Sequence, residues 1–178
     1  MRTEIEAKLK VESHKEVIEK LDELGAEFLA EQLQEDSYFD DADRTLTETD
    51  RCLRLRQLLV GKSERFFLTY KGAKEKDEFK KRQEIEIEIK GADSVEKLLS
   101  ALAYEKVLVF EKRRRIWRLG DCKVALDELP LLGNFVEIEG PDDKKIAAIQ
   151  RNLGLADLPH IGKSYASLVA KKQIVNSK

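Results

Sequence analysis

Charged and apolar side chains alternate near the start of the chain, in the segment Glu4-Ile5-Glu6-Ala7-Lys8. Residues two apart on a β-strand point to the same side, so Glu4, Glu6 and Lys8 share one face of a predicted strand. By itself the pattern also fits an ordinary half-buried strand with one solvated face. Its chemical interest is that carboxylates bind hard divalent cations, whereas an ammonium group binds anions.

The same alternation returns in later predicted strands, with acidic faces on some and basic faces on others. The further acidic candidates are Glu84, Glu86, Glu88, Asp127, Glu137 and Glu139. The basic candidates on the later strands are Arg54, Arg56, Lys71, Lys112 and Arg114. Three glutamates in a row on one strand repel one another unless cations or a metal face them. Faces of opposite sign that are turned toward one another would line a charged tunnel.

The segment Lys112-Arg113-Arg114-Arg115 is ambiguous in this respect. Both faces of a strand through it carry charge, so the alternation alone does not say which cations point inward.

The elements that must position these charges are strands joined by amphipathic helices. The strand faces opposite the charged ones are rich in Ile, Leu, Val and Phe, and four predicted helices carry apolar stripes to cover them. The predicted helices lie within residues 13–25, 93–102, 141–154 and 164–174. This combination predicts an α+β protein. An antiparallel sheet that closes into a barrel can place its apolar face outward, under helices, and its charged face inside.

A charged interior restricts the ligand, because each buried charge needs a partner. Clustered carboxylates suit Mg²⁺ or Mn²⁺, and several Lys and Arg side chains suit phosphate groups. A polyphosphate or a nucleoside triphosphate satisfies both requirements, since phosphoryl chemistry depends on positioning and charge neutralisation.

Composition excludes several other classes of protein. The chain has 178 residues, of which 38% are charged, and its formal net charge is -2. This balance gives no basic field for DNA. Cys52 and Cys122 match no metal or redox spacing and are predicted to be reduced thiols. The sequence contains no signal peptide and no apolar run long enough to span a bilayer, so we expect a soluble, cytoplasmic protein without a membrane partner.

The ordered set of motifs resembles the CYTH family, also called triphosphate tunnel metalloenzymes, over nearly the whole chain. The matching segments are Glu4-Ile5-Glu6-Ala7-Lys8, 34–40, 53–56, 70–72, 84–86, 112–114, 126–127 and 135–140. The resemblance implies a single CYTH domain over residues 1–178. It also implies a closed antiparallel eight-stranded β-barrel, the triphosphate tunnel, with helices packed outside.

The resemblance also implies a role for each charged residue. Glu4, Glu6 and Lys8 are the implied catalytic residues. The implied metal ligands are Glu4, Glu6, Asp127, Glu137 and Glu139. The implied phosphate ligands are Lys8, Arg54, Arg56, Lys71, Lys112 and Arg114, which leaves Arg113 and Arg115 on the outer side. Glu84 and Glu86 match tunnel positions, either as metal contacts or as ion-pair partners of Arg54 or Arg114.

Several functions are compatible with this family. The first is a class IV-type adenylyl cyclase, which converts ATP to 3′,5′-cyclic AMP and pyrophosphate with Mg²⁺ or Mn²⁺. The second is a triphosphatase acting on inorganic tripolyphosphate, a nucleoside triphosphate or thiamine triphosphate. The third is a non-catalytic phosphate-binding module. A homodimer is also compatible with the family, although no residue indicates it.

The remaining histidine and aromatic side chains are predicted to lie at the surface or to serve in packing, without a catalytic role. His14, at a predicted helix start, and His160, in a predicted loop, are expected at the surface. Trp117 and Tyr38 are expected to serve in packing rather than in stacking on a base. No Gly-rich phosphate-binding loop is present, which excludes a P-loop enzyme.

Overall fold

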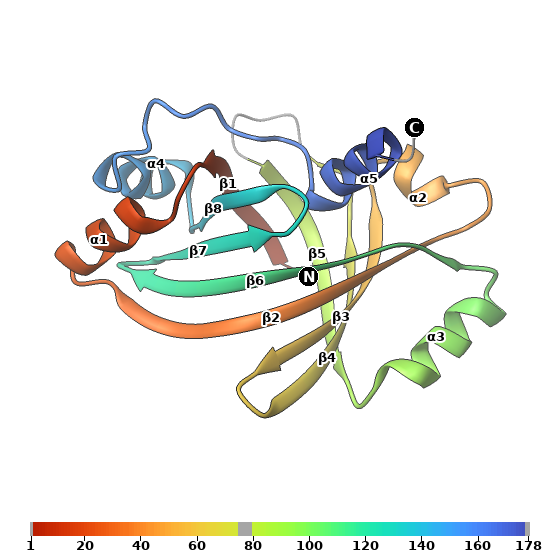
Figure 1. Cartoon of the computed structure of the whole chain (residues 1–178). Helices are drawn as coiled ribbons and strands as arrows, with labels where there is room; N and C mark the ends of the chain where they lie inside the picture. Colours follow the sequence, from red (N-terminus) through yellow and green to blue (C-terminus); the bar gives the residue numbers. More distant parts are fainter. Residues whose placement is uncertain (1, 75–79, 177–178) are drawn as a thin grey trace.

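The computed structural model describes residues 2–74 and 80–176, without the side chains of residues 2–4, 80, 81 and 176. Strands and helices alternate along this part of the chain (Figure 1). The strands are β1 (Arg2–Val11), β2 (Glu27–Asp40), β3 (Cys52–Val60), β4 (Ser63–Lys71), β5 (Lys80–Ile89), β6 (Glu105–Leu119), β7 (Cys122–Leu129) and β8 (Gly133–Glu139). The helices are α1 (Lys15–Glu23), α2 (Thr45–Glu48), α3 (Ala92–Ala101), α4 (Asp143–Asn152) and α5 (Tyr165–Asn176).

The strands form one antiparallel sheet in the order β1-β5-β4-β3-β2-β6-β7-β8. β1 has a neighbour on both sides, because its first half pairs with β5 and its second half pairs with β8. The two ladders meet at Glu6, which faces Lys80 of β5 and Glu139 of β8. The predicted α+β class and the eight-stranded antiparallel sheet are confirmed. The two ends of the strand order therefore meet at β1, where β5 and β8 pair with different halves of the same strand.

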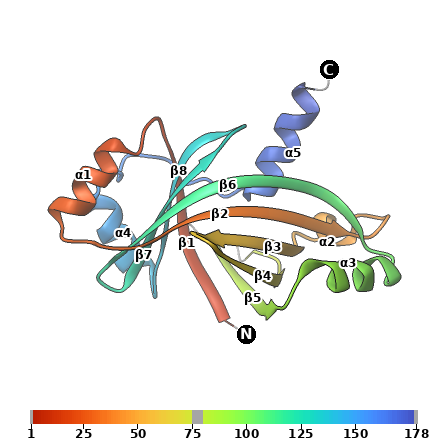
Figure 2. The ribbon, with the colours of Figure 1, turned by 60° about the horizontal axis from the view of Figure 1, so that its bottom comes forward.

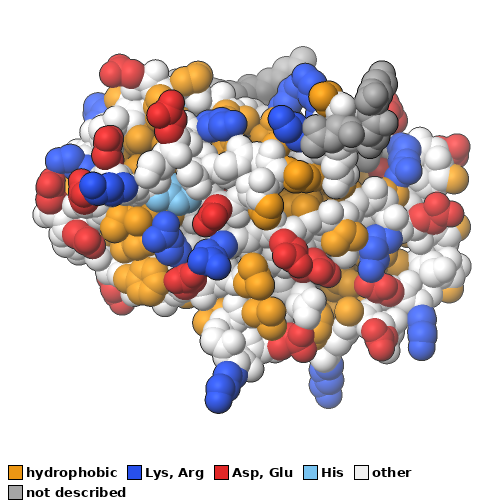
Figure 3. Space-filling view, viewed as in Figure 1, with side chains coloured by type: hydrophobic (Ala, Val, Ile, Leu, Met, Phe, Trp, Pro, Cys, Tyr) orange, Lys and Arg blue, Asp and Glu red, His pale blue; other side chains and the backbone are white. Residues whose placement is uncertain are grey.

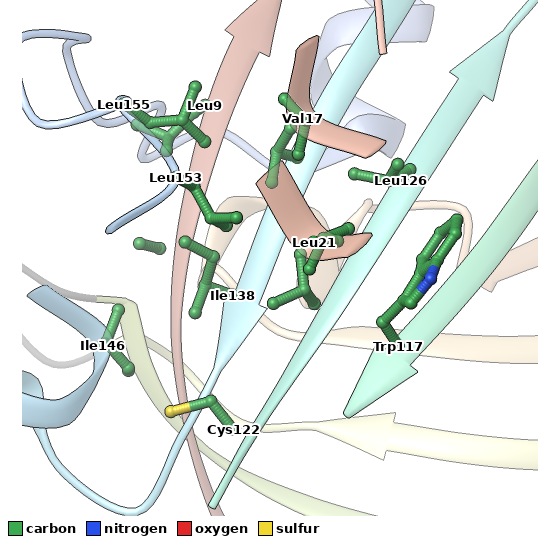
Figure 4. Packing of buried hydrophobic residues seen from close by; sticks show 13 residues of the cluster. Leu9, Val17, Leu21, Trp117, Cys122, Leu126, Ile138, Ile146, Leu153 and Leu155 are labelled. Carbon is green, nitrogen blue, oxygen red and sulfur yellow. The ribbon is translucent and has the colours of Figure 1, made fainter. Parts of the chain in front are cut away.

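The main hydrophobic core lies on the outer face of β1, β7 and β8, beneath α1 and α4 (Figure 4). Leu9, Leu126 and Ile138 alternate with the charged residues of their strands and are almost completely buried. Val17 and Leu21 of α1 complete the cluster from outside. The period of two therefore divides these strands into an apolar outer face and a charged inner face.

Replacing Leu9 with alanine is expected to lower the free energy of unfolding by about 2–5 kcal/mol, because the substitution leaves a cavity in a close-packed cluster. Urea unfolding measures the change. Leu98→Ala on α3 is the matched control, since Leu98 is 58% exposed and its loss should change stability by at most about 0.5 kcal/mol. Equal effects of the two substitutions would contradict this location of the core.

The helix α3 covers a second part of the outer face. Leu99 of α3 packs with Phe39 of β2 and Leu55 of β3 in a separate cluster. Figures 1 and 2 both place α3 well away from α1 and α4. The predicted helices around residues 13–25, 93–102 and 141–154 therefore exist, and each covers the outer surface of the sheet.

The terminal helix α5 departs from the prediction that the helices pack outside. Its Tyr165 and Val169 are buried against Phe110, Leu129 and Phe135. Phe110 and Phe135 alternate in step with the charged residues of β6 and β8, so α5 packs on the inner, charged face. In Figure 2 it stands apart from the layer formed by α1 and α4. The short helix α2, within the polar segment 40–50, lies near α5 in Figure 1.

Buried Asp40 explains why this polar segment becomes helical. Its carboxylate accepts hydrogen bonds from the backbone N–H groups of Leu46 and Thr47, both at 2.9 Å, and thereby satisfies donors in the first turn of α2.

None of the helices in the described residues is both long enough and apolar enough to cross a membrane.

Candidate active site

The inner faces of the strands, together with α2 and α5, surround a cavity of about 1000 Å³. All six side chains predicted to bind phosphate lie on its wall, although they come from four different strands. They are Lys8, Arg54, Arg56, Lys71, Lys112 and Arg114. The surface seen in Figure 3 looks different, because positive and negative side chains are interspersed there without a large patch of one sign. The six predicted cations therefore converge on the cavity and not on this face of the molecule.

Asp36 of β2 holds the two arginines of β3. Its carboxylate accepts hydrogen bonds from Arg56 Nε at 2.6 Å and from Arg56 Nη2 at 2.7 Å, and Arg54 Nη1 lies 3.9 Å away. The carboxylate is almost fully buried. Burial acts to raise the pKa of Asp36, but the charges of Arg56 and Arg54 outweigh it and hold the pKa far below the usual range. Asp36 therefore stays ionised and fixes the direction of both guanidinium groups.

The glutamates of β5 serve as ion-pair partners for cations of β3 and β4. Glu86 accepts a hydrogen bond from the hydroxyl of Thr69 at 2.9 Å and lies 3.5 Å from Arg54 Nη2. Glu84 accepts one from Lys71 Nζ at 3.1 Å. Both glutamates line the cavity. The predicted ion pair with Arg54 is thus present for Glu86, whereas Glu84 pairs with Lys71 instead, and the alternative of metal contact stays a prediction.

A second group of charges joins β6, β7 and β8 around Arg114. Arg114 Nε donates to Asp127 at 2.6 Å, and its Nη2 donates to both Asp127 and Glu137. Lys112 lies 3.5 Å from Asp127, and Lys8 lies 3.2 Å from Glu137. Arg114, Lys112 and Lys8 thus neutralise two carboxylates that would otherwise be buried at high cost.

The pKa of Lys112 lies well below the usual range of a lysine. Burial and the adjacent charge of Arg114 lower its pKa to about 7, although Asp127 acts in the opposite direction. Its ammonium group also lies 4.8 Å from the ring centroid of Tyr165. Lys112 therefore exchanges a proton near neutral pH, and a bound anion would favour its charged form.

The predicted metal ligands differ in their surroundings. Glu6, Glu137 and Glu139 line the cavity, whereas Asp127 is fully buried behind Arg114. The side chain of Glu4 lies outside the described part of the structure. Among the described side chains, no three from His, Cys, Asp and Glu are grouped closely enough to hold a metal ion.

Glu6 and Glu139 are nevertheless suitable as the first two ligands of a metal ion. They are direct cross-strand partners on β1 and β8, and both line the cavity. Directly opposed carboxylates repel unless a cation lies beside them. Glu4, two residues before Glu6 in the sequence, was predicted to share this face, and this stays a prediction. Oxygen donors of this kind suit Mg²⁺ or Mn²⁺.

The charges that point away from the cavity are also clear. Arg113 is exposed and lies 3.8 Å from Glu31, and Arg115 lies against His14. The predicted division of residues 112–115 into inward and outward cations is thus confirmed. Glu88, which alternates with Glu84 and Glu86, was grouped with the acidic interior, and this prediction is wrong. It is exposed and accepts hydrogen bonds from Arg65 at 2.7 and 2.8 Å.

The surface prediction for His14 is wrong. His14 is buried, donates from Nε2 to the carbonyl oxygen of Phe135 at 3.0 Å, and accepts from Arg115 at Nδ1. Burial lowers its pKa, which favours the neutral ring. His160 is half-buried and contacts Gln150 at 2.9 Å. Trp117 packs in the core as predicted.

Tyr38 has two roles. Its ring stacks on Phe110 with centroids 5.7 Å apart, as the packing prediction requires, but it also lines the cavity.

Sequence reasoning missed several residues of the cavity wall. Arg82 of β5 is buried, and it donates to the carbonyl oxygens of Gly72 and Asp50, each at 2.8 Å. It lies two residues before Glu84, so continued alternation would have found it. Gln34 of β2 lies two residues before Asp36, so the same alternation would have placed it on the cavity wall. Tyr165 of α5 contacts the ammonium group of Lys8 at 3.9 Å from its ring centroid, and no strand pattern could have indicated it.

Comparison with known proteins agrees with this geometry. Residues 2–165 match the CYTH domain. A Methanocaldococcus jannaschii protein named "putative adenylate cyclase" is 35% identical over 136 residues, which are 76% of this chain and 75% of that protein. The chain belongs to the CYTH domain family.

Solved structures show the same fold. Protein PH1819 from Pyrococcus horikoshii OT3 has a TM-score of 0.81 at 31% identity, over 95% of this chain and 99% of that one. A Hippeastrum protein, described as a "putative adenylyl cyclase" with a dominant triphosphatase activity, has a TM-score of 0.72 at 18% identity. That alignment covers 94% of this chain and 95% of the Hippeastrum chain.

Proposed function

We propose that this protein is a divalent-metal-dependent enzyme that acts on a triphosphate within the cavity, which serves as the triphosphate tunnel. The observation that carries the proposal is the convergence of six Lys and Arg side chains on one cavity whose wall also contains Glu6 and Glu139. Buried Arg54 also has a free donor, since its Nε has no hydrogen-bond partner among the described residues. A phosphate oxygen would satisfy it.

The reaction that we favour is that of a class IV-type adenylyl cyclase. The 3′-hydroxyl oxygen of ATP attacks the α-phosphorus, the bond from that phosphorus to the bridging oxygen breaks, and pyrophosphate leaves. The similarity to the Methanocaldococcus jannaschii protein supports this choice, because the name of that protein refers to the same activity.

The protein's part in this reaction is binding and orientation. Arg54 and Arg56, held by Asp36, would bind phosphate oxygens, together with Lys8 and Lys112 of the same cavity wall. Such fixed cations stabilise the charge that develops on the leaving pyrophosphate. Mg²⁺ or Mn²⁺ held by Glu4, Glu6 and Glu139 would neutralise charge and lower the pKa of a nearby hydroxyl group.

Hydrolysis is the second candidate reaction. The same residues would bind a triphosphate whose terminal phosphorus is attacked by water. The Hippeastrum protein, with its triphosphatase activity, has this fold and so favours considering the reaction here.

Product analysis tests both reactions. The purified protein is incubated with Mg²⁺ or Mn²⁺ and either ATP or tripolyphosphate. Cyclic AMP with pyrophosphate supports the cyclase. Orthophosphate with ADP, or with pyrophosphate from tripolyphosphate, identifies a triphosphatase instead. Absence of turnover with both compounds would contradict the enzyme and favour a phosphate-binding module.

The lowered pKa of Lys112 predicts a pH-dependent affinity. Below pH 7 the amine is charged and attracts phosphate, and above pH 7 it loses its proton in the free protein. The affinity for tripolyphosphate should therefore fall as the pH rises, by up to about tenfold per pH unit. Lys112→Arg keeps its charge throughout this range and serves as the reference. Calorimetric titrations from pH 6 to 9 measure both proteins, and parallel profiles would contradict the prediction.

A further inference from the structure

The first residue of α5 lies beside the group of charges around Arg114. Tyr165 is 6% exposed and lines the cavity. Its ring packs edge-on against the ring of Phe135 on β8, with the two centroids 5.2 Å apart and the planes at 78°. Val169, one turn further along α5, is buried in the same cluster. The ring of Tyr165 therefore has a fixed place in the cavity wall.

This ring contacts two lysines that the sheet does not bring together. The Nζ atom of Lys8 lies 3.9 Å from the ring centroid of Tyr165, and that of Lys112 lies 4.8 Å from it. Both distances are within the range of about 6 Å at which an aromatic ring attracts an ammonium group. Lys8 belongs to β1 and Lys112 to β6, and β7 and β8 lie between these strands in the strand order. One side chain of α5 thus links cations from two strands that are not neighbours.

The chain segment that leads into α5 is bound to Lys8 as well. The Nζ atom of Lys8 donates to the carbonyl oxygen of Lys163 at 3.2 Å, and the backbone carbonyl oxygen of Lys8 accepts from the N–H group of Ile161 at 2.8 Å. The same Nζ atom lies 3.2 Å from Glu137. An ammonium group has three N–H donors. The carbonyl group, the carboxylate and the ring of Tyr165 therefore define the direction in which this ammonium group points.

A neutral ring suits this position for an electrostatic reason. Lys8 and Lys112 are 2% and 3% exposed, so their ammonium groups have lost most of their hydration. Burial and two neighbouring carboxylates raise the pKa of Tyr165 well above its ordinary value, so its hydroxyl group keeps its proton. A further carboxylate at this position would compete with phosphate for the lysines. The ring attracts both ammonium groups and leaves their positive charge available to an anion.

We propose that Tyr165 is a positioning residue, which orients Lys8 and Lys112 toward a bound phosphate group. Its influence on the ligand is exerted through the two ammonium groups. The inference rests on the proposed function, because the lysines are oriented for the phosphates of that substrate. It gives α5 a part in phosphate binding, although this helix contributes none of the six cations of the cavity wall.

Removal of the aromatic ring tests the assignment. Tyr165→Leu should weaken the binding of tripolyphosphate by about tenfold, because both ammonium groups lose the ring that orients them. Tyr165→Phe keeps the ring and should bind within about twofold of the wild type. Isothermal titration calorimetry of the full chain with Mn²⁺ measures the affinities. Tyr165→Met, which also lacks a ring, replaces the leucine variant if that variant does not fold, and the same loss is expected.

Val169→Ala is the matched control for packing. Among the described residues, Val169 belongs to the same buried cluster as Tyr165 and not to the cavity wall. The substitution loosens the contact between α5 and the sheet without removing a ring. Binding of tripolyphosphate should therefore change by at most about twofold.

A double-mutant cycle separates positioning from a merely structural role. Tyr165→Leu should cause a smaller loss of affinity in a Lys8→Gln background than in the wild type, since one of the two groups on which it acts is gone. Equal losses in both backgrounds would overturn the positioning role. Wild-type affinity in Tyr165→Leu, or about a tenfold loss in Tyr165→Phe or in Val169→Ala, would overturn it as well. Failure of the wild-type protein to bind tripolyphosphate would instead overturn the proposed function, and the positioning role with it.

Discussion

Glu6→Gln is expected to lower kcat by at least about a hundredfold, on the scale of losing one preorganised electrostatic contact at a reacting centre. Glu6 lies opposite Glu139 on the cavity wall, and the proposed metal needs the negative charge of this pair. Glutamine keeps the shape of the side chain but removes that charge. The affinity for Mn²⁺, measured by calorimetry without substrate, should fall together with the rate.

The same substitution should leave the fold intact, so thermal unfolding of Glu6→Gln is measured alongside activity. Glu88→Gln is the matched control, because Glu88 also belongs to an alternating strand but pairs with Arg65 outside the cavity. It should retain the wild-type rate. Wild-type turnover in Glu6→Gln would remove Glu6 from the catalytic set, and loss of turnover in both variants would show that charge in general, and not this site, matters.

Alternation predicted the strand-borne part of the site for a simple geometric reason. Side chains on a strand repeat every two residues, so Lys8, Arg54 and Arg56 could be assigned to charged faces from local sequence alone. Opposite faces such as Leu9 and Leu126 then had to form the core. The resemblance to the CYTH family added which face of residues 112–115 points inward, and the structure agrees.

What local sequence could not give is the identity of the partners. The pairing of Asp36 with Arg56, or of Glu137 with Lys8, depends on register between strands that are far apart in the chain. Burial of His14 depends in the same way on the carbonyl group of Phe135.

The sequence pattern of α5 could not predict on which face of the sheet the helix packs. Its face is built from small residues such as Ala166 and Ala170, which carry no strong helical stripe toward either side of a sheet. Its location on the inner face follows from the contacts of Tyr165 with Phe135 and Lys8.

Arg114→Leu is expected to lower the free energy of unfolding by about 3–5 kcal/mol, the usual cost of removing one partner from a buried ion pair. Arg114 donates to Asp127 and Glu137, and Asp127 is fully buried. Without the guanidinium group, Lys112 would be the one described cation left within ion-pair distance of Asp127. Urea unfolding at pH 7 measures the loss. Binding of tripolyphosphate should weaken as well, since a cation of the cavity wall is removed.

Arg113→Leu is the matched control, because it is the adjacent residue on the outer face, where its pair with Glu31 is more than half exposed. Exposed pairs contribute at most about 1 kcal/mol, so its unfolding should change little. A double variant separates charge from packing. Asp127→Asn added to Arg114→Leu should recover part of the lost stability, because it removes the charge that Arg114 had neutralised. Additive losses would show that Arg114 stabilises the sheet by packing, and that neutralising the charge of Asp127 is not its contribution to stability.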